Sequence, residues 1–305
     1  MLLGPIQRHV LRRAGEDPER DTSVMHVSEV VKSDWCPRNS FYRLSQVPTT
    51  DKPFNRSFRM TNVLTEGSTI HDKYQTWMHE MGVLFGTWRC KDCVHVFDAD
   101  RPAFCVACGS PRLQYREVHL RKDDVRLVGH ADAGVRLDPD DPFLVEIKSI
   151  GLRSLKFDAP RFYERYEQGE SLDSIWQDIK RPFPSHLRQG LMYCWMCQLE
   201  RIVFIYEWKP TQEVKEFVVT FRLSLVESIV EDIEEVNRCL RTNIEPERPV
   251  WATGPEGSTC ASCEYRSKCW EVENGDGAKK DEIERPRVIR AKTATRKKAL
   301  AKGDS

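Results

Sequence analysis

Apolar residues recur every three or four positions in several segments of the chain, which is the period of an α-helix with one buried face. Ile70, Tyr74 and Trp77 illustrate this period. A further helix is predicted to be interrupted at Cys36-Pro37, because proline is tolerated in a first turn but breaks a helix interior. The predicted helices cover residues 27–44, 67–81, 185–199 and 223–240.

Shorter segments form apolar or alternating runs bounded by turn residues, as β-strands do. The runs 125–136 and 143–150 are separated by a turn sequence of aspartate and proline, and the runs 201–208 and 213–221 follow as a hairpin pattern. Residues 1–23 are polar and are expected to be irregular. The mixture of helices and strands in this order predicts the α/β class.

The composition indicates an ordinary globular core, since 40% of the 305 residues are hydrophobic and 31% are charged. The apolar runs are too short to cross a bilayer, so no membrane is expected among the partners. The N-terminus becomes charged too early for a secretory signal, and the cytosol is therefore the expected compartment.

Charge is balanced overall but unevenly distributed. Residues 285–305 contain eight Lys or Arg residues and one acidic residue, which gives this tail a charge of +7 and leaves the rest of the neutral chain at −7. Such a tail either attracts phosphate groups without sequence preference or is simply solvated.

The eleven cysteines are the most informative feature of the composition. In a cytosolic chain, clustered cysteines bind metal more often than they form disulfides. Cys90, Cys93, Cys105 and Cys108 form two CxxC pairs, which predict a zinc ribbon with four thiolates around a structural zinc ion. A second iron–sulfur site is the alternative for this segment.

A second group combines Cys260, Cys263 and Cys269 with Cys36 far upstream. Four thiolates suit either an iron–sulfur cluster or zinc, and unliganded core cysteines are the remaining alternative. A metal here would close a very long loop and stabilise the fold. The other three cysteines are predicted to pack as small apolar side chains; they are Cys194, Cys197 and Cys239.

The candidate chemistry lies in the predicted strand 143–150. Alternate side chains of a strand share a face, so Glu146 and Lys148 point the same way. A hairpin with the preceding strand would place Asp132 near Glu146. Two converging carboxylates are costly unless a cation lies between them, and the adjacent lysine would then hold or activate a water. The alternative is a half-exposed strand with a cross-strand ion pair.

Three further residues complete a pattern. His71 lies on a predicted upstream helix, and Gln189 and Tyr193 share one face of the helix that follows the sheet. The order His, Asp, Glu-x-Lys, Gln-x-x-x-Tyr resembles the RecB-type branch of the PD-(D/E)XK nucleases over residues 67–193. Asp132 lies in His-Ala-Asp-Ala rather than after a proline, as it does in the RecB-type variants.

This resemblance implies a fold and a metal site. The fold would be α/β, with a restriction-endonuclease-like mixed sheet flanked by helices, a zinc-ribbon insertion and an iron–sulfur clasp. Asp132 and Glu146 would bind a catalytic Mn²⁺ or Mg²⁺, with His71 and the carbonyl of Ile147 as further ligands. The imidazole would favour Mn²⁺ over Mg²⁺ by ligand softness.

The resemblance also implies roles for the polar residues around the metal. Lys148 would orient the attacking water and stabilise the charged transition state. Gln189 and Tyr193 would contact DNA or brace the site.

The second group of cysteines resembles the iron–sulfur clasp of AddB-like and CRISPR-associated exonucleases in the same superfamily. In those proteins one N-terminal and three C-terminal cysteines hold a [4Fe–4S] cluster. The resemblance implies the same role for Cys36, Cys260, Cys263 and Cys269.

The site residues and the resemblance together predict a metal-dependent DNA nuclease, in particular an exonuclease on single-stranded ends. The resemblance implies a role in recombination, repair or spacer processing in a prokaryotic cell or phage-infected host. The chain has no Walker A motif, so any ATP-driven motor would be a separate helicase or recombination partner. The alternative is a catalytically inactive DNA-binding assembly factor that uses the nuclease fold as a scaffold. The presence of Asp132, Glu146 and Lys148 together argues against that alternative.

Five segments are expected along the chain, in an order that places the ribbon inside the nuclease. They are an N-terminal helical part with Cys36 and the His71 helix (1–83), the zinc-ribbon insertion (84–118), the nuclease core (119–251), the iron–sulfur segment (252–273) and a basic tail expected to be disordered (274–305).

Overall fold

The computed structural model describes residues 2–15, 20–49 and 57–271. The fold presented below is that of the first compact unit, Met1–Arg266; a second unit begins at Ser267. The basic tail predicted for residues 274–305 lies outside the described residues.

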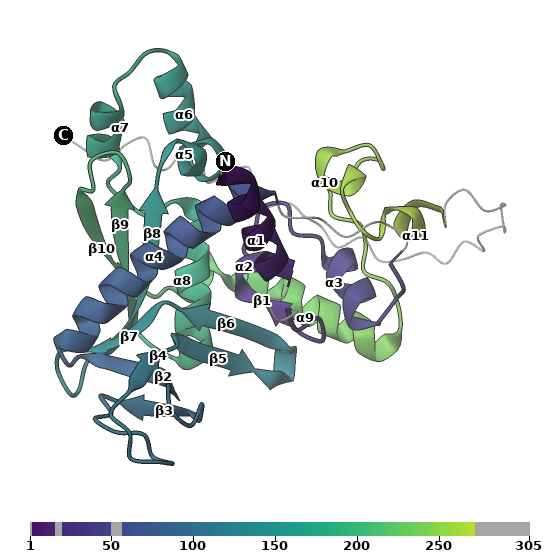
Figure 1. The fold of residues 1–305 in the computed structure, drawn as a ribbon. Coiled ribbons are helices and arrows are strands. Elements are labelled where there is room, and N and C mark those ends of the chain that lie inside the picture. Colours follow the sequence, from purple (N-terminus) through teal and green to yellow (C-terminus); the bar gives the residue numbers. More distant parts are fainter. Residues whose placement is uncertain (1, 16–19, 50–56, 272–305) are drawn as a thin grey trace, which may run out of the picture. The chain divides into compact units, whose positions relative to one another are not determined.

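A seven-stranded mixed sheet forms the centre of the first unit (Figure 1). Its order is β10-β9-β8-β7-β2-β3, with β4 also paired to β2. Strands β8 and β9 are parallel, and the other described pairings in this sheet are antiparallel. The strands are β2 (Leu84–Cys90), β3 (Val96–Asp100), β4 (Leu113–Tyr115), β7 (Ala133–Arg136), β8 (Pro142–Ile150), β9 (Arg201–Trp208) and β10 (Val214–Thr220).

A smaller sheet has the order β1-β6-β5. Strand β6 (Leu127–Ala131) belongs to the small sheet and β7 to the large one, so the chain passes from one sheet to the other at Asp132. The single strand predicted over residues 125–136 is therefore two strands. The other members are β1 (Met25–His26) and β5 (Val118–Lys122).

Helices cover both faces of the large sheet (Figure 1). Helix α4 (Phe58–Glu80) packs Tyr74 against the face that carries Val145 and Ile147. On the other face, α8 (Pro184–Cys197) contributes to a second apolar cluster that includes Leu144. The predicted α/β class, a mixed sheet flanked by helices, is confirmed by this arrangement.

The remaining helices of the first unit are α1 (Leu3–Gly15), α2 (Val27–Val30), α3 (Pro37–Leu44), α5 (Leu152–Asp158), α6 (Pro160–Glu167), α7 (Leu172–Asp178), α9 (Glu227–Thr242) and α10 (Ser258–Ala261), with 3₁₀ turns η1 (Asp123–Val125) and η2 (Leu223–Leu225). Helix α11 (Arg266–Glu271) begins at the last residue of the first unit and otherwise belongs to the second.

Two boundaries differ from the sequence-based expectation. The prediction that residues 1–23 are irregular is wrong, because α1 forms within them; its Leu, Gln and Arg residues are good helix formers despite the polar composition. Helix α4 starts at Phe58, well before the predicted start at residue 67, because the Ser57 hydroxyl accepts a hydrogen bond from the amide of Met60. The interruption at Cys36-Pro37 is confirmed, since Pro37 begins α3.

Segments distant in sequence are tied together beside α3. The Arg38 side chain donates from Nε to the carbonyl of Pro246 at 2.9 Å. The Tyr42 hydroxyl donates to Glu245 Oε2 at 2.8 Å. These bonds join the start of the first unit to the segment that follows α9.

Strand β2 belongs to the cysteine ribbon as well as to the large sheet. It pairs with β7 at Leu84↔Val135 and, farther along, with β3 and β4 up to Cys90. Trp88 in β2 is fully buried, and its ring lies 5.1 Å from that of Tyr115 in β4. The segment 84–118 is thus continuous with the sheet through β2.

Among the described residues, no helix is both long enough and apolar enough to cross a membrane.

Two helical glycines offer a matched test of how closely α8 packs on β9. A Cβ atom at Gly190 would lie 2.5 Å from Phe204 Cζ, whereas one at Gly67 in α4 would meet nothing within 4 Å. Gly190→Ala should therefore lower the free energy of unfolding by about 1–3 kcal/mol through overpacking. Gly67→Ala should raise it by about 0.5–1 kcal/mol. Denaturant unfolding of both variants measures the difference, and a stabilising Gly190→Ala would contradict this packing.

Candidate active centre and cysteine sites

The pairing of β7 with β8 brings two carboxylates together. Ala133 is opposite Val145, so the residues just beyond this pair are Asp132 and Glu146. The amide N–H of Ile147 donates to Asp132 Oδ2 at 2.6 Å. Both acids are buried, with 6% of Asp132 and 1% of Glu146 exposed. The predicted proximity of Asp132 and Glu146 is thus found in the structure.

Helix α4 contributes two side chains from the other side of Asp132. His71 Nδ1 lies 3.2 Å from Asp132 Oδ1. One turn later, the Gln75 side-chain amide donates to the backbone carbonyl of Asp132 at 2.7 Å. The sequence reasoning missed Gln75, although its i, i+4 spacing from His71 places it on the same helix face.

Lys148 approaches Glu146 along the shared face of β8. Its Nζ lies 2.6 Å from Glu146 Oε2, and the two groups form a buried ion pair. Among the described residues, neither carboxylate oxygen of Glu146 accepts a well-formed hydrogen bond. Apart from the ion pair with Lys148, this buried carboxylate has fewer polar partners than it would have in water.

The three groups have different protonation tendencies. Burial, and then the charge of Asp132, raises the pKa of Glu146 to about 7. Burial also acts to raise the pKa of Asp132, but the hydrogen bond and charge of His71 outweigh it and lower that pKa. Burial acts to lower the pKa of Lys148, but the charges of Glu146 and Asp132 raise it, so the ammonium group is charged at neutral pH.

The two predicted residues of α8 form a chain behind Lys148. Lys148 Nζ donates to Gln189 Oε1 at 3.2 Å, and Gln189 Nε2 donates to the Tyr193 hydroxyl at 2.8 Å. Tyr193 is 2% exposed. The structure therefore brings Gln189 to the lysine directly and Tyr193 only through Gln189.

Glu117, which no sequence pattern singled out, also lies at the centre. It comes immediately before β5, and one ligand atom from each of His71, Glu117 and Asp132 lies within 4.8 Å of the others. Burial, followed by the charge of Asp132, raises the pKa of Glu117 to about 7. Its position depends on the tertiary fold, so no local spacing could have revealed it.

Two cavities open beside the centre. One, of about 410 Å³, is lined by His71, Gln75 and Glu117, among others. The second, of about 430 Å³, is lined by Arg20, Gln189 and further residues. The first cavity gives His71 and Glu117 access to solvent, and the second borders Gln189.

The donor set fits a divalent cation. The convergence of Glu146 and Asp132 is the decisive feature, because an ion between the two buried carboxylates would offset the repulsion that the single ammonium group of Lys148 leaves. Carboxylates suit Mg²⁺ and Mn²⁺, and the imidazole of His71 adds a ligand that Mn²⁺ accepts readily. The backbone of Ile147 faces Asp132, and the N–H and carbonyl of one residue in a strand lie on the same edge. The carbonyl of Ile147 therefore lies on the edge of β8 that faces Asp132, as a ligand of an ion bound there would have to.

The ribbon cysteines form a group able to hold a metal ion. Cys90 Sγ lies 3.6 Å from Cys108 Sγ, Cys93 Sγ lies 3.6 Å from Cys105 Sγ, and all four sulfurs lie within 4.8 Å of one another. A tetrahedral zinc ion with Zn–S bonds of about 2.3 Å would separate its sulfurs by about 3.8 Å. The spacing of the four sulfurs fits such an ion.

Backbone amides support this group of sulfurs. The N–H groups of Asp92 and Ala107 donate to Cys90 Sγ and Cys105 Sγ, each at 3.4 Å. The backbone N–H groups of Cys93 and Asp92 lower the pKa of Cys90 to about 6. Thiolates, not thiols, bind metal, so this environment favours the ligand form of Cys90, whereas the pKa values of Cys93 and Cys108 are raised.

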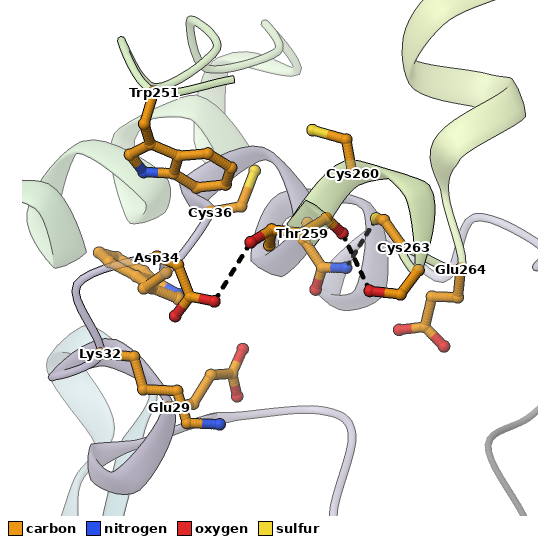
Figure 2. A pocket seen from close by; sticks show the side chains of 12 residues that line it. Glu29, Lys32, Asp34, Cys36, Trp251, Thr259, Cys260, Cys263 and Glu264 are labelled. Atoms are coloured by element: carbon orange, nitrogen blue, oxygen red, sulfur yellow. Dashed lines mark hydrogen bonds between the residues drawn. The ribbon is translucent and has the colours of Figure 1, made fainter. Parts of the chain in front are cut away.

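Three cysteines of the predicted clasp line one pocket of about 450 Å³ (Figure 2). Cys36 precedes α3, while Cys260 and Cys263 come from the turn at α10. Asn39 Nδ2 and the Tyr265 amide each donate to Cys263 Sγ at 3.4 Å. The fourth predicted ligand, Cys269, belongs to the second unit.

The three remaining cysteines lie away from these groups. Cys194 and Cys239 are buried, and Cys197 is partly buried against the same apolar cluster as Cys194. These positions agree with a packing role.

No protein-family model matches this chain. No curated protein matches it either. Similar solved structures include that of SSO0001, with a TM-score of 0.40 and 13% identity over 87% of this chain and 94% of that one. They also include an alkaline exonuclease (LHK-Exo) from Laribacter hongkongensis, with a TM-score of 0.40 and 12% identity over 73% of this chain and 90% of that one. The same exonuclease in complex with dAMP has a TM-score of 0.39.

Removing one ribbon thiolate tests the four-cysteine site. Cys93→Ala should lose one equivalent of bound metal per chain. Residues 88–113 should also become disordered, because a metal site stabilises the segments that supply its ligands. Elemental analysis and hydrogen exchange measure both effects. Cys239→Ala, which removes a buried thiol outside the group, should retain the metal. Undiminished metal in Cys93→Ala would contradict the assignment.

Proposed function

We propose that this protein is a divalent-metal-dependent DNA nuclease that hydrolyses phosphodiester bonds at the centre formed by Asp132, Glu146 and Lys148. One observation carries the proposal. Two buried carboxylates converge, one of them has no well-formed hydrogen bond, and a charged lysine stands beside it on the same strand.

The cation is proposed to lie between Asp132 and Glu146, with His71 and the carbonyl of Ile147 as additional ligands. Bound there, it would polarise the scissile phosphate and lower the pKa of the attacking water. The amide of Ile147 holds Asp132 Oδ2, which limits the reorientation of that carboxylate. A cation and an ammonium group on one face attract an anionic phosphodiester and oppose its developing charge.

Lys148 is proposed to hold the phosphate and orient the attacking water. Its raised pKa supports a charged, electrostatic role rather than that of a neutral base. Gln189 accepts from the ammonium group and is itself held by the hydroxyl of Tyr193. In this proposal both residues position Lys148, and neither reacts.

The resemblance of these residues to RecB-type nucleases extends the proposal to its finer parts. The substrate would be single-stranded DNA, degraded from an end, with a helicase or recombination protein as partner. The ribbon would hold zinc, and Cys36, Cys260, Cys263 and Cys269 would hold a [4Fe–4S] cluster.

Charge-removing variants test the catalytic proposal. Asp132→Asn, Glu146→Gln and Lys148→Ala should each reduce Mn²⁺-dependent cleavage of DNA by at least about a hundredfold. The first two remove a carboxylate ligand of the proposed cation, and the third removes the ammonium group that opposes the developing negative charge. Glu234→Gln, on the exposed face of α9, is the matched control and should cleave normally. DNA binding should survive in all four variants.

The substrates should be single-stranded DNAs labelled at the 5′ or the 3′ end, so that product ladders report polarity together with activity. Near-normal cleavage by Glu146→Gln would refute the assignment of the active centre to this site. Binding without cleavage by the unmodified protein would favour the DNA-binding scaffold instead.

Metal analysis tests the two cysteine sites separately. Anaerobically purified protein should contain about four iron ions and one zinc ion per chain. Cys36→Ala should lose the iron and melt at a lower temperature than Cys93→Ala, because Cys36 would tie together segments more than two hundred residues apart. Two zinc ions and no iron would overturn the cluster but leave the nuclease proposal standing.

A further inference from the structure

The segment that forms the cysteine ribbon also positions Glu117 at the candidate active centre. After Cys108, the chain returns through β4 (Leu113–Tyr115) and reaches Glu117 two residues later. Strand β4 is held by β2, with Trp88 opposite Tyr115 and Cys90 opposite Leu113. The strand that carries a ribbon thiolate is therefore the one on which the Glu117 segment is aligned.

Backbone hydrogen bonds fix the Glu117 segment to β2 beyond the end of β4. The Arg116 amide donates to the carbonyl of Thr87 at 2.8 Å, and the Thr87 amide donates to the carbonyl of Glu117 at 2.9 Å. Glu117 has a φ of +74°, a conformation that non-glycine residues adopt only when their surroundings impose it. Its backbone position is thus set by β2.

The side chain of Glu117 reaches the same group as two proposed ligands of the catalytic cation. Its carboxylate lies within 4.8 Å of ligand atoms of His71 and Asp132. In an octahedral site with bonds of about 2.1 Å, neighbouring ligands lie about 3 Å apart and opposite ones about 4.2 Å apart. Small side-chain adjustments would therefore place all three groups around one ion.

Two further observations support a ligand here. Glu146, 1% exposed, faces the same Asp132; its carboxylate is ion-paired with Lys148 at one oxygen and accepts no well-formed hydrogen bond among the described residues. A cavity of about 410 Å³, lined in part by His71 and Glu117, leaves room for an ion with its remaining waters.

We propose that Glu117 is an additional carboxylate ligand of the active-site cation, and that the cysteine ribbon thereby couples its own metal to the affinity of the catalytic one. This inference rests on the proposed function, because it assumes a cation at Asp132 and Glu146. Loss of the ribbon metal would release the alignment of β4 on β2 and withdraw Glu117 from the centre. The ribbon is then a part of the catalytic site rather than an appended module.

In the test, the full-length protein with its structural metals in place is titrated with Mn²⁺. Binding is measured by calorimetry and by the electron paramagnetic resonance signal of free Mn²⁺. Glu117→Gln should weaken Mn²⁺ binding by about ten- to a hundredfold. Glu234→Gln removes the same charge far from the site and should bind as the unmodified protein does. Thermal melts without Mn²⁺ check that Glu117→Gln remains folded.

Coupling to the ribbon is tested with Cys93→Ala alone and combined with Glu117→Gln. If both act through the same ligand, the double variant should bind Mn²⁺ no more weakly than Glu117→Gln alone. Gly86→Ala provides a second route if Cys93→Ala does not fold. Its Cβ would lie 2.8 Å from the Glu117 carbonyl, so it should weaken Mn²⁺ binding while keeping the ribbon metal.

The outcomes separate the two proposals. If Asp132→Asn binds Mn²⁺ as tightly as the unmodified protein, the active-site cation itself is refuted. If Asp132→Asn loses binding but Glu117→Gln does not, only the role of Glu117 is refuted. If the losses in Glu117→Gln and Cys93→Ala add fully in the double variant, Glu117 is a ligand but the coupling is refuted.

Discussion

The antiparallel pairing of β7 with β8 is the constraint on which the candidate centre depends. Its register places Asp132 opposite Glu146, and the amide of Ile147 then holds the Asp132 carboxylate in place. A shift of one residue would turn Glu146 and Lys148 to the face occupied by α4 and bring Val145 and Ile147 into their place. The apolar pattern that buries β8 therefore also fixes the charged residues, and the stability of the sheet and the geometry of the centre cannot be separated.

Much of this centre could be predicted because two local rules generate it. Alternation along a strand puts Glu146 and Lys148 on one side, and a hairpin turn brings Asp132 across from them. Spacing along a helix likewise relates Gln189 to Tyr193. Glu117 escaped prediction because β2 and β4 fix its position, and no rule of spacing connects it to His71. The break at Asp132 was missed for a related reason, since the run 125–136 has the pattern of one continuous strand and only the pairing partners show that it serves two sheets.

The concentration of charge at this centre carries an energetic cost. Three carboxylates meet one lysine and one histidine in a largely buried site, and burial raises the pKa of two of the carboxylates to about 7. Such an arrangement is unfavourable for folding by itself and is typical of sites shaped for a ligand rather than for stability. The aromatic packing of Trp88 and Tyr115 and the two apolar clusters supply the stability that the centre lacks.

The bonds from Arg38 to Pro246 and from Tyr42 to Glu245 have a consequence for synthesis in the cell. At about 5–20 residues per second, roughly 10–40 s separate the emergence of α3 from that of its partners on a ribosome. During this time α3 has none of these partners, and Cys260 and Cys263 have not yet been synthesised when Cys36 emerges. The large sheet can assemble earlier, because β10 ends at Thr220. Closure around α3 therefore cannot precede the synthesis of Glu245 and Pro246.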